Sequence, residues 1–175
     1  MPTIGVSLAV PEPWGRRLQE YRVALGDESA RQIPTHVTLL PPTDVADEEL
    51  GAIGDHLEQV AGRVAPFRVH LRGTGTFRPV SPVVFVVVVE GISACEQLTA
   101  LVRSGPLRTD LRFPYHPHVT VAHDVPEADL DKAFRELASF ECLFEAEAFH
   151  LYTHDDQQGW TTDSTFALTG APGSR

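Results

Sequence analysis

The chain has 175 residues, of which 42% are hydrophobic and 22% are charged, a composition typical of a folded globular domain. Its 24 acidic and 14 basic residues give a net charge of -10, which argues against binding to long nucleic acids or anionic membranes. The two cysteines, Cys95 and Cys142, are too few for a disulfide framework and lie in apolar surroundings, as expected for free thiols in a reducing compartment. We therefore expect a cytoplasmic protein. We also expect it to be a monomer.

The first half of the chain alternates strand-like and helical periodicities. Its predicted elements are a strand at 3–10, a helix at 12–25, a strand at 33–40, a helix at 47–64 and a strand at 66–78. We expect the second of these strands to stop at Pro41-Pro42, because prolines interrupt regular structure. The first ten residues contain no basic residue before their apolar run, so they do not resemble a secretory signal.

The second half repeats this order and adds a strand pair. Its predicted elements are a strand at 83–90, a helix at 92–103, a strand at 117–122, a helix at 126–139, one long strand at 142–153 and a strand at 160–168. The most apolar stretch, 83–89, is much shorter than the ~20 residues needed to span a bilayer as a helix. We expect no membrane segment, and we expect residues 170–175 to form a flexible tail.

Two short segments reveal an internal repeat. His36-Val-Thr-Leu-Leu-Pro aligns with His118-Val-Thr-Val-Ala-His, and each is followed by an acidic helix start and a strand. We therefore predict a single α+β domain over residues 1–169 with two pseudo-symmetric lobes and an internal repeat that spans roughly residues 1–80 and 81–169. Each lobe would be a largely antiparallel sheet with helices on its outer face, and the active cleft would lie between the lobes.

The repeated segments carry residues suited to phosphoryl chemistry. Side chains two apart on a strand share one face, so His36 and Thr38 point to the same side, as do His118 and Thr120. One histidine on each side of a phosphorus atom could remove a proton from the attacking oxygen while the other protonates the leaving oxygen. Threonine hydroxyls could donate hydrogen bonds to the non-bridging oxygens. This chemistry needs no metal or other cofactor.

The doubling of the motif makes it specific. With 8 histidines and 14 threonines, chance predicts ~0.6 His-x-Thr tripeptides, so a single copy is weak evidence. Requiring Val, Ile or Leu at the second and fourth positions lowers the expectation to about 0.03, yet two copies occur. The alternative is a purely structural role, in which both histidines are strand residues whose rings form local hydrogen bonds.

These motifs, 82 residues apart, resemble those of the 2H phosphoesterase superfamily, whose bacterial branch is 2′-5′ RNA ligase-like and includes RNA 2′,3′-cyclic phosphodiesterases. The resemblance covers nearly the whole chain. Its flanking patterns also match, at Ile33-Pro34-Thr35, Pro41-Pro42, Gly73-Thr-Gly-Thr-Phe77 and Tyr115-His116-Pro117. It implies a metal-independent hydrolase acting on a small cyclic-phosphate nucleotide or an RNA terminus, with a 2′-phosphate product and a minor reverse ligation.

The resemblance also implies roles for individual residues. His36 and His118 would be the acid and the base, in an order that the sequence leaves open, and Thr38 and Thr120 would bind the phosphate. Three further positions are candidates for substrate binding: Phe77 and Tyr115, which could equally be core aromatics, and His123. Bacterial cyclic phosphodiesterases often carry arginine at the position of His123. This departure from the family pattern concerns the specificity for RNA ends.

The sequence is also compatible with two functions other than metal-independent hydrolysis. The same fold could be a non-catalytic module that binds nucleotides or RNA ends. Alternatively, a metal-dependent hydrolase could use histidine clusters. The candidate clusters are His116, His118 and His123, and His150 with His154 and Asp155. Strand geometry disfavours the second cluster, because its members would need an additional bend to meet at one ion.

Overall fold

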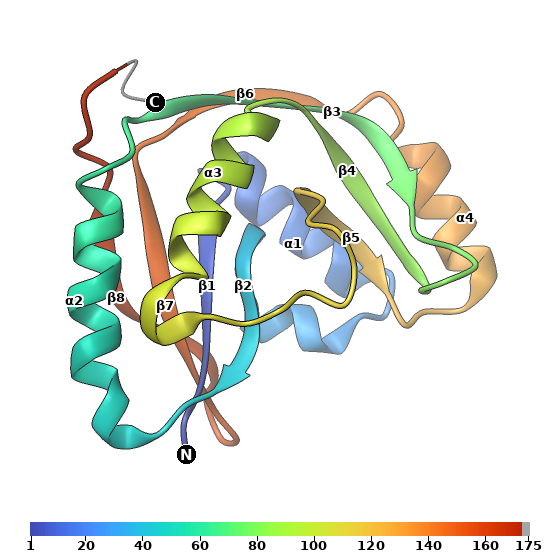
Figure 1. The fold of residues 1–175 in the computed structure, drawn as a ribbon. Coiled ribbons are helices and arrows are strands. Elements are labelled where there is room, and N and C mark those ends of the chain that lie inside the picture. The colour runs from blue at the N-terminus through green and yellow to red at the C-terminus, as the bar shows by residue number, and fades with distance from the viewer. Residues whose placement is uncertain (173–175) are drawn as a thin grey trace.

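The computed structural model describes residues 1–172 and contains two four-stranded antiparallel sheets (Figure 1). The first sheet has the order β2 (His36–Asp44), β1 (Thr3–Ala9), β7 (Ala148–Asp155) and β8 (Gly159–Ala167). The second has the order β5 (His118–His123), β4 (Val83–Glu90), β3 (Phe67–Thr76) and β6 (Glu141–Ala146). The predicted α+β class with two antiparallel sheets is confirmed.

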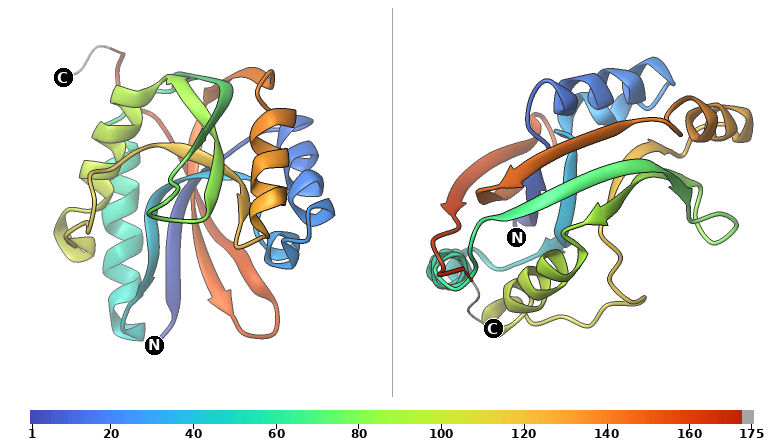
Figure 2. Two further views of the ribbon diagram at one scale, coloured as in Figure 1. Left: turned by 90° about the vertical axis from the view of Figure 1, so that its right-hand side faces the viewer. Right: turned by 90° about the horizontal axis from the view of Figure 1, so that it is seen from above.

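Four helices flank the sheets in two pairs, which lie on opposite sides of the strands (Figure 2). Their bounds are α1 (Trp14–Ala24), α2 (Leu50–Ala61), α3 (Ile92–Val102) and α4 (Glu127–Glu136), and the short 3-10 helices are Glu28–Gln32, Asp47–Glu49 and Gly105–Leu107. Helix α2 contacts α3 and β8, whereas α4 packs on β3, β4 and β5. Helix α1 also contacts β5, and α3 contacts β2, so each of these helices touches the sheet of the other lobe.

The apolar faces of both sheets and their helices meet in one continuous core. The stripe predicted for α2 lies in this core, where Ile53 and Leu57 are fully buried and Val60 is nearly so. Burial of each such side chain contributes roughly 1.5–3 kcal/mol relative to exposure. Amphipathic helices therefore hold the two lobes together through a shared interior.

The strand predicted at 142–153 is two strands, β6 and β7, that belong to different sheets. The chain leaves β3 after Ala146 and pairs with β1 between His150 and His154. Glu147 lies at this switch, where its carbonyl accepts a hydrogen bond from the Leu168 amide at 2.9 Å. A continuous alternating pattern describes both strands equally well, so it does not mark the change of partner.

Strand β2 continues through Pro41-Pro42 to Asp44, so the prediction that these prolines end it is wrong. The strand lies at the edge of its sheet and pairs with β1 alone. The register slips at this point, between the pairs Ile4–Thr43 and Val6–Leu40. Prolines are tolerated in edge strands and at such irregularities, because no partner there requires their missing amide.

Both sheets contain strands from each half of the chain. Strand β3 comes from residues before 81 but lies in the second sheet, whereas β7 and β8 come from the second half and lie in the first. The symmetry is instead between strand orders, β2-β1-β7-β8 and β5-β4-β3-β6, so that β1 and β2 correspond to β4 and β5. Each lobe is completed by strands from the other half of the chain.

The end of the described chain is attached to the fold. The Gly170 amide donates a hydrogen bond to the Val64 carbonyl at 3.0 Å; residues 173–175 of the predicted tail lie outside the described residues. Every helix within residues 1–172 is too short or too polar to span a lipid bilayer.

Gly75 in β3 makes room for an aromatic ring of the neighbouring strand. It pairs with Phe85 of β4, and a Cβ atom at Gly75 would lie 2.7 Å from two atoms of the Phe85 ring. Because carbon atoms do not approach so closely, an alanine at this position would displace the ring or the strand. The close approach explains why the second sheet has a glycine here.

We predict that Gly75→Ala lowers the free energy of unfolding by about 1–3 kcal/mol, the usual cost of overpacking. Gly54→Ala in α2 is the matched control, because a Cβ there meets no atom within 4 Å and alanine favours a helix by roughly 0.8–1.0 kcal/mol. Urea denaturation followed by circular dichroism measures both changes. A Gly75→Ala protein as stable as the wild type would contradict the proposed contact.

Candidate active site

The two histidine motifs lie on adjacent edge strands. Strands β2 and β5 are each at the end of a sheet, and they contact one another across the lobes. In both motifs the histidine and threonine are half-buried, whereas Val37 and Val119 between them are fully buried. The predicted alternation therefore holds, with the apolar side chains in the core and the polar ones on the opposite face.

A β-bulge follows the threonine in each motif strand. The register slips by one residue at Leu39 in β2 and at Val121 in β5. Leu39 and Leu40 are consequently both buried, as are Val121 and Ala122. Two successive apolar residues after the threonine are thus accommodated in the core, because the extra residue of a bulge locally changes the alternation.

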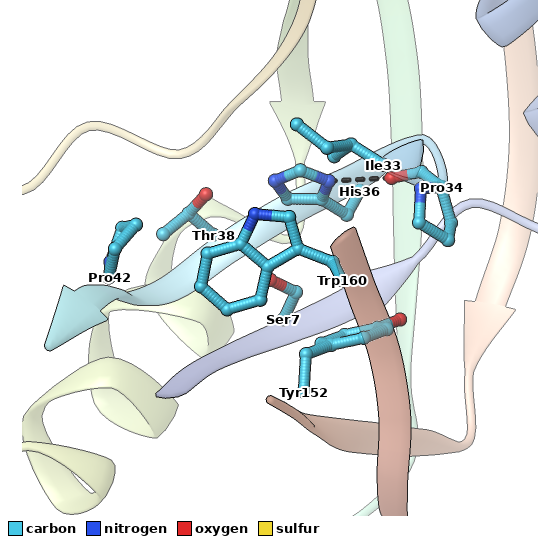
Figure 3. Close-up of a pocket in the computed structure, with 8 residues that line it drawn as sticks. All are labelled: Ser7, Ile33, Pro34, His36, Thr38, Pro42, Tyr152 and Trp160. Atoms are coloured by element: carbon cyan, nitrogen blue, oxygen red, sulfur yellow. Dashed lines mark hydrogen bonds between the residues drawn. The ribbon is translucent and has the colours of Figure 1, made fainter. Parts of the chain in front are cut away.

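Each motif histidine is held by a backbone carbonyl two residues earlier. His36 Nδ1 lies 2.6 Å from the Pro34 oxygen, and His118 Nδ1 lies 2.7 Å from the His116 oxygen; the first of these hydrogen bonds is the dashed line in Figure 3. A carbonyl can only accept, so in both residues Nδ1–H is the donor. This arrangement leaves the Nε2 atom of each ring as the nitrogen available for proton transfer.

Burial lowers the pKa of both histidines below the ordinary value of 6.5. The carbonyl hydrogen bonds act in the opposite direction, because they favour the protonated ring. For His36, the positive charges of Arg22 and His118 lower the pKa further, and His116 does the same for His118. The neutral form of both rings is therefore favoured at neutral pH.

Two cavities adjoin the motif strands. One, with a volume of about 130 Å³, is lined by Ser7, Ile33, Pro34, His36, Thr38, Pro42, Tyr152 and Trp160 (Figure 3). The other is larger, about 510 Å³, and contains His118, Thr38, Pro42 and much of the loop at 109–116 in its lining. Because Thr38 and Pro42 line both, the two spaces meet at the first motif, with one motif histidine in the wall of each.

The Phe77 ring packs against the ring of His118. The half-buried Phe77 ring lies edge-on to the His118 ring with centroids 4.9 Å apart, and it packs on Phe85 at 4.5 Å. Phe85 and His116 complete this aromatic cluster around the second motif. The cluster excludes water from one side of the imidazole, which fits the lowered pKa of His118.

Tyr115 links the two lobes. Its hydroxyl donates a hydrogen bond to the backbone carbonyl of Thr38 at 2.8 Å, and its side chain lines the larger cavity. Burial raises the pKa of Tyr115 well above its ordinary value, so the hydroxyl is a proton donor throughout the neutral range. The loop before the second motif is thereby fixed to the strand that carries the first.

Comparison with known proteins assigns this arrangement to a family. The family model described as the 2′-5′ RNA ligase superfamily matches residues 10–158. The chain belongs to this superfamily. Its match includes both motif strands, and it confirms the resemblance that the doubled His-x-Thr pattern suggested.

Relatives of this superfamily member have similar lengths. A Bacillus mycoides protein, provisionally named a phosphoesterase, is 28% identical over 138 residues, which are 78% of this chain and 80% of that protein. A Bacillus cereus protein with the same provisional name matches to the same extent. In both cases the aligned region spans about four fifths of each protein.

Solved structures of two bacterial proteins share the fold. E. coli LigT complexed with 3′-AMP superimposes with a TM-score of 0.71 at 22% identity, over 96% of this chain and 98% of LigT. A Thermus thermophilus protein gives a TM-score of 0.68 at 26% identity, over 97% and 99% of the two chains. The two-sheet architecture is thus common to all three proteins.

The two remaining predicted site residues are Thr120 and His123, both on β5. Thr120 is half-buried opposite Phe85. His123 is exposed at the end of β5, with its Nε2 atom 3.4 Å from Asp124 Oδ2. Among the described residues that line the two cavities, neither Thr120 nor His123 is included. The structure thus places His36, Thr38, Tyr115 and His118 in the walls of the two cavities and Phe77 against the His118 ring, whereas His123 lies beside Asp124.

The sequence did not indicate four residues that surround His36. Ser7, Tyr152 and Trp160 come from β1, β7 and β8 and line the smaller cavity. Arg22 is buried in α1, where it donates two hydrogen bonds to Asp27. Trp160 follows a turn that the sequence marks clearly, but its position beside His36 depends on the pairing of β7 with β1, which is not a local property of the sequence.

The histidine clusters considered as metal sites have other partners. His118 Nδ1 is engaged by the His116 carbonyl, His150 Nδ1 lies 2.9 Å from Thr165 Oγ1, and the His154 ring packs against Trp160. Within residues 1–172, no group of three His, Cys, Asp or Glu side chains is placed to share one metal ion.

We predict that the protein loses stability as the pH falls below 6.5. The unfolded histidines take up protons near that value, whereas His36 and His118 do so only at lower pH in the folded state, so protonation favours the unfolded chain. The double variant His36→Gln/His118→Gln should flatten this dependence. Urea denaturation between pH 5 and 8 tests the expectation, and equal slopes for the two proteins would contradict it.

We also predict that Tyr115→Phe lowers the free energy of unfolding by about 1 kcal/mol, because the Thr38 carbonyl loses its donor in a part-buried setting. Tyr21→Phe is the matched control, since the Tyr21 hydroxyl contacts only the exposed Glu136 carboxylate, at 3.1 Å, and its removal should change stability by less than about 0.5 kcal/mol. Equal effects of the two substitutions in thermal denaturation would argue against the inter-lobe link.

Proposed function

We propose that this protein is a phosphodiesterase that opens a 2′,3′-cyclic phosphate on a nucleotide or a short RNA end, giving a 2′-phosphate. The observation that carries the proposal is the matched pair of hydrogen bonds from the Nδ1 atoms of His36 and His118 to backbone carbonyls. Each bond leaves Nε2 free on a face shared with a threonine, so two proton-transfer groups are available at one cleft.

The proposed reaction is an in-line displacement at phosphorus. One Nε2 atom accepts a proton from water as the water oxygen forms a bond to phosphorus, and the other donates its proton to the ribose 3′ oxygen as that P–O bond breaks. Thr38 and Thr120 would donate hydrogen bonds to the non-bridging oxygens, where negative charge develops. The two histidines exchange protonation states during the step and are restored through solvent, so the chemistry requires no metal.

The lowered pKa values fit a site that receives an anion. In the free protein both rings favour the neutral form, which suits the base. A bound phosphate places negative charge beside both rings and raises their affinity for a proton, which supplies the acid. Substrate binding would thereby create the pair of one neutral and one charged histidine that the reaction needs.

Charge and relatives support a small substrate. The net charge of -10 disfavours binding along an extended nucleic acid. E. coli LigT, which shares the fold, has been crystallised with 3′-AMP, NADP+ and ATP, all of them small phosphate compounds. We therefore propose a mononucleotide or RNA terminus as the substrate, and a cytoplasmic monomer as the working form.

We predict that the purified protein hydrolyses 2′,3′-cyclic nucleotides in the presence of a chelator, and that His36→Ala and His118→Ala each lower kcat/KM by about a hundredfold or more, the usual contribution of a general acid or base. His70→Ala is the control, because His70 pairs with Glu141 at 2.7 Å on the second sheet and should retain wild-type activity. Product release is followed by chromatography that separates 2′- from 3′-phosphates.

Other results would replace the proposal. Tight binding of a nucleoside 2′-phosphate without turnover of any cyclic nucleotide would indicate a binding module. Activity that the chelator abolishes and zinc restores would indicate a metal-dependent hydrolase. A kcat/KM profile that is flat between pH 5 and 8 would contradict catalysis by two histidines.

A further inference from the structure

The smaller cavity, beside His36, has the properties of a site for a flat apolar group. Its lining is mostly apolar, with the side chains of Ile33, Pro34 and Pro42 around the ring of Trp160. Figure 3 shows the indole in front of Ser7, with Thr38 and Pro42 on one side and Ile33 and Pro34 on the other. Sites of this kind, with aromatic walls and a few polar groups, are typical of pockets for planar ligands.

Trp160 is held in place from two directions. It is the register partner of His154, whose ring meets it at a centroid distance of 5.1 Å. On the β1 side the indole lies over Gly5, where a Cβ atom would come within 3.5 Å of its Cζ3 atom. Contacts to both neighbours fix the orientation of the half-buried ring before any ligand binds, which reduces the entropic cost of stacking.

Polar groups in the cavity are free to bind a ligand. Among the described residues, none forms a hydrogen bond with the hydroxyls of Ser7 and Thr38 or with the indole N–H of Trp160. Ser7 is only 7% exposed, so its hydroxyl has limited access to bulk water. A planar ligand with ring nitrogens and carbonyl oxygens would satisfy these groups, whereas a purely aliphatic one would leave them unpaired.

The volume of the cavity sets the size of that group. At about 130 Å³ it is close to the ~150 Å³ of an engineered protein cavity that binds benzene. There is room for one six-membered ring and its substituents, whereas a fused bicyclic ring would extend beyond the walls. The size of this cavity therefore favours a pyrimidine, since a purine would have to extend past Thr38 into the larger cavity.

We propose that this cavity binds the base of the substrate and that Trp160 makes the protein selective for pyrimidine over purine 2′,3′-cyclic phosphates. The inference rests on the proposed function and adds the class of base to it. Stacking on the indole would hold the ring, with the ribose and the phosphate continuing past Thr38, where the cavity meets the larger one. Phe77, for which the family resemblance implies substrate binding, contacts the His118 ring.

The first test compares kcat/KM for the four 2′,3′-cyclic nucleotides. We expect the cytidine and uridine compounds to exceed the adenosine and guanosine compounds by about tenfold or more. Trp160→Ala should lower the pyrimidine values by about five- to hundredfold, the range for loss of a base–aromatic stack, mainly through KM, and should remove the preference. Trp160→Phe, which keeps a ring, should retain most of it. Equal turnover of all four nucleotides by the wild type would overturn the proposal.

A binding experiment separates this inference from the proposed reaction. The chain has two tryptophans, and Trp14 lines neither cavity among the described residues, so Trp14→Phe leaves Trp160 as the single tryptophan fluorophore. Titration with cytidine 2′-monophosphate should change its emission at concentrations several-fold lower than adenosine 2′-monophosphate does. Inorganic phosphate, which has no ring, should not reproduce the change.

The two experiments give distinguishable failures. A fluorescence response specific to the cytidine compound without turnover would support the base site and reject the reaction. Turnover of all four nucleotides with no response from Trp160 would support the reaction and reject the base site. Circular dichroism of each variant establishes that it is folded, and if Trp160→Ala does not fold, Trp160→Phe and the Trp14→Phe titration decide the outcome.

Discussion

Everything proposed for this site depends on where the ring protons of two histidines lie. The carbonyls of Pro34 and His116 accept hydrogen bonds from the Nδ1 atoms of His36 and His118, and that choice of tautomer aims both Nε2 atoms away from the backbone. The acceptor is in each case a main-chain atom just before an edge strand, so the fold itself supplies it. A change elsewhere in the cleft can alter the ligand without altering this pair.

The surroundings of the two rings oppose positive charge, which makes the site responsive to an anion. Burial lowers both pKa values, and Arg22 adds a positive charge near His36. Arg22 is itself paired with Asp27 at 2.6 Å, so it contributes a fixed charge from behind the site rather than a flexible phosphate ligand. Proton uptake is then coupled to phosphate binding, because the anion and the added proton stabilise each other.

Sequence patterns predicted the features that depend on residues close in the chain, such as the position of a strand or the buried face of a helix. They did not predict features that depend on which distant strands pair with one another. The spacing of His36 and Thr38, the stripe of α2 and the strand at 83–90 all follow from periodicity. The division of 142–153 between two sheets, and the position of Trp160 beside His36, depend on the strands with which each segment pairs. Hydrophobic alternation is the same for either partner, so it carries no information on that choice.

The two lobes repeat their motifs but not the residues opposite them, and this difference decides where a base could bind. Thr38 faces Ser7 across the first sheet, whereas Thr120 faces Phe85 across the second. A small side chain leaves room beside His36 for the cavity under Trp160, while the Phe85 ring fills the equivalent space and packs against Phe77 and His118. The two imidazoles are thus placed symmetrically but have different surroundings: a small cavity under Trp160 beside His36, and an aromatic cluster and the larger cavity beside His118.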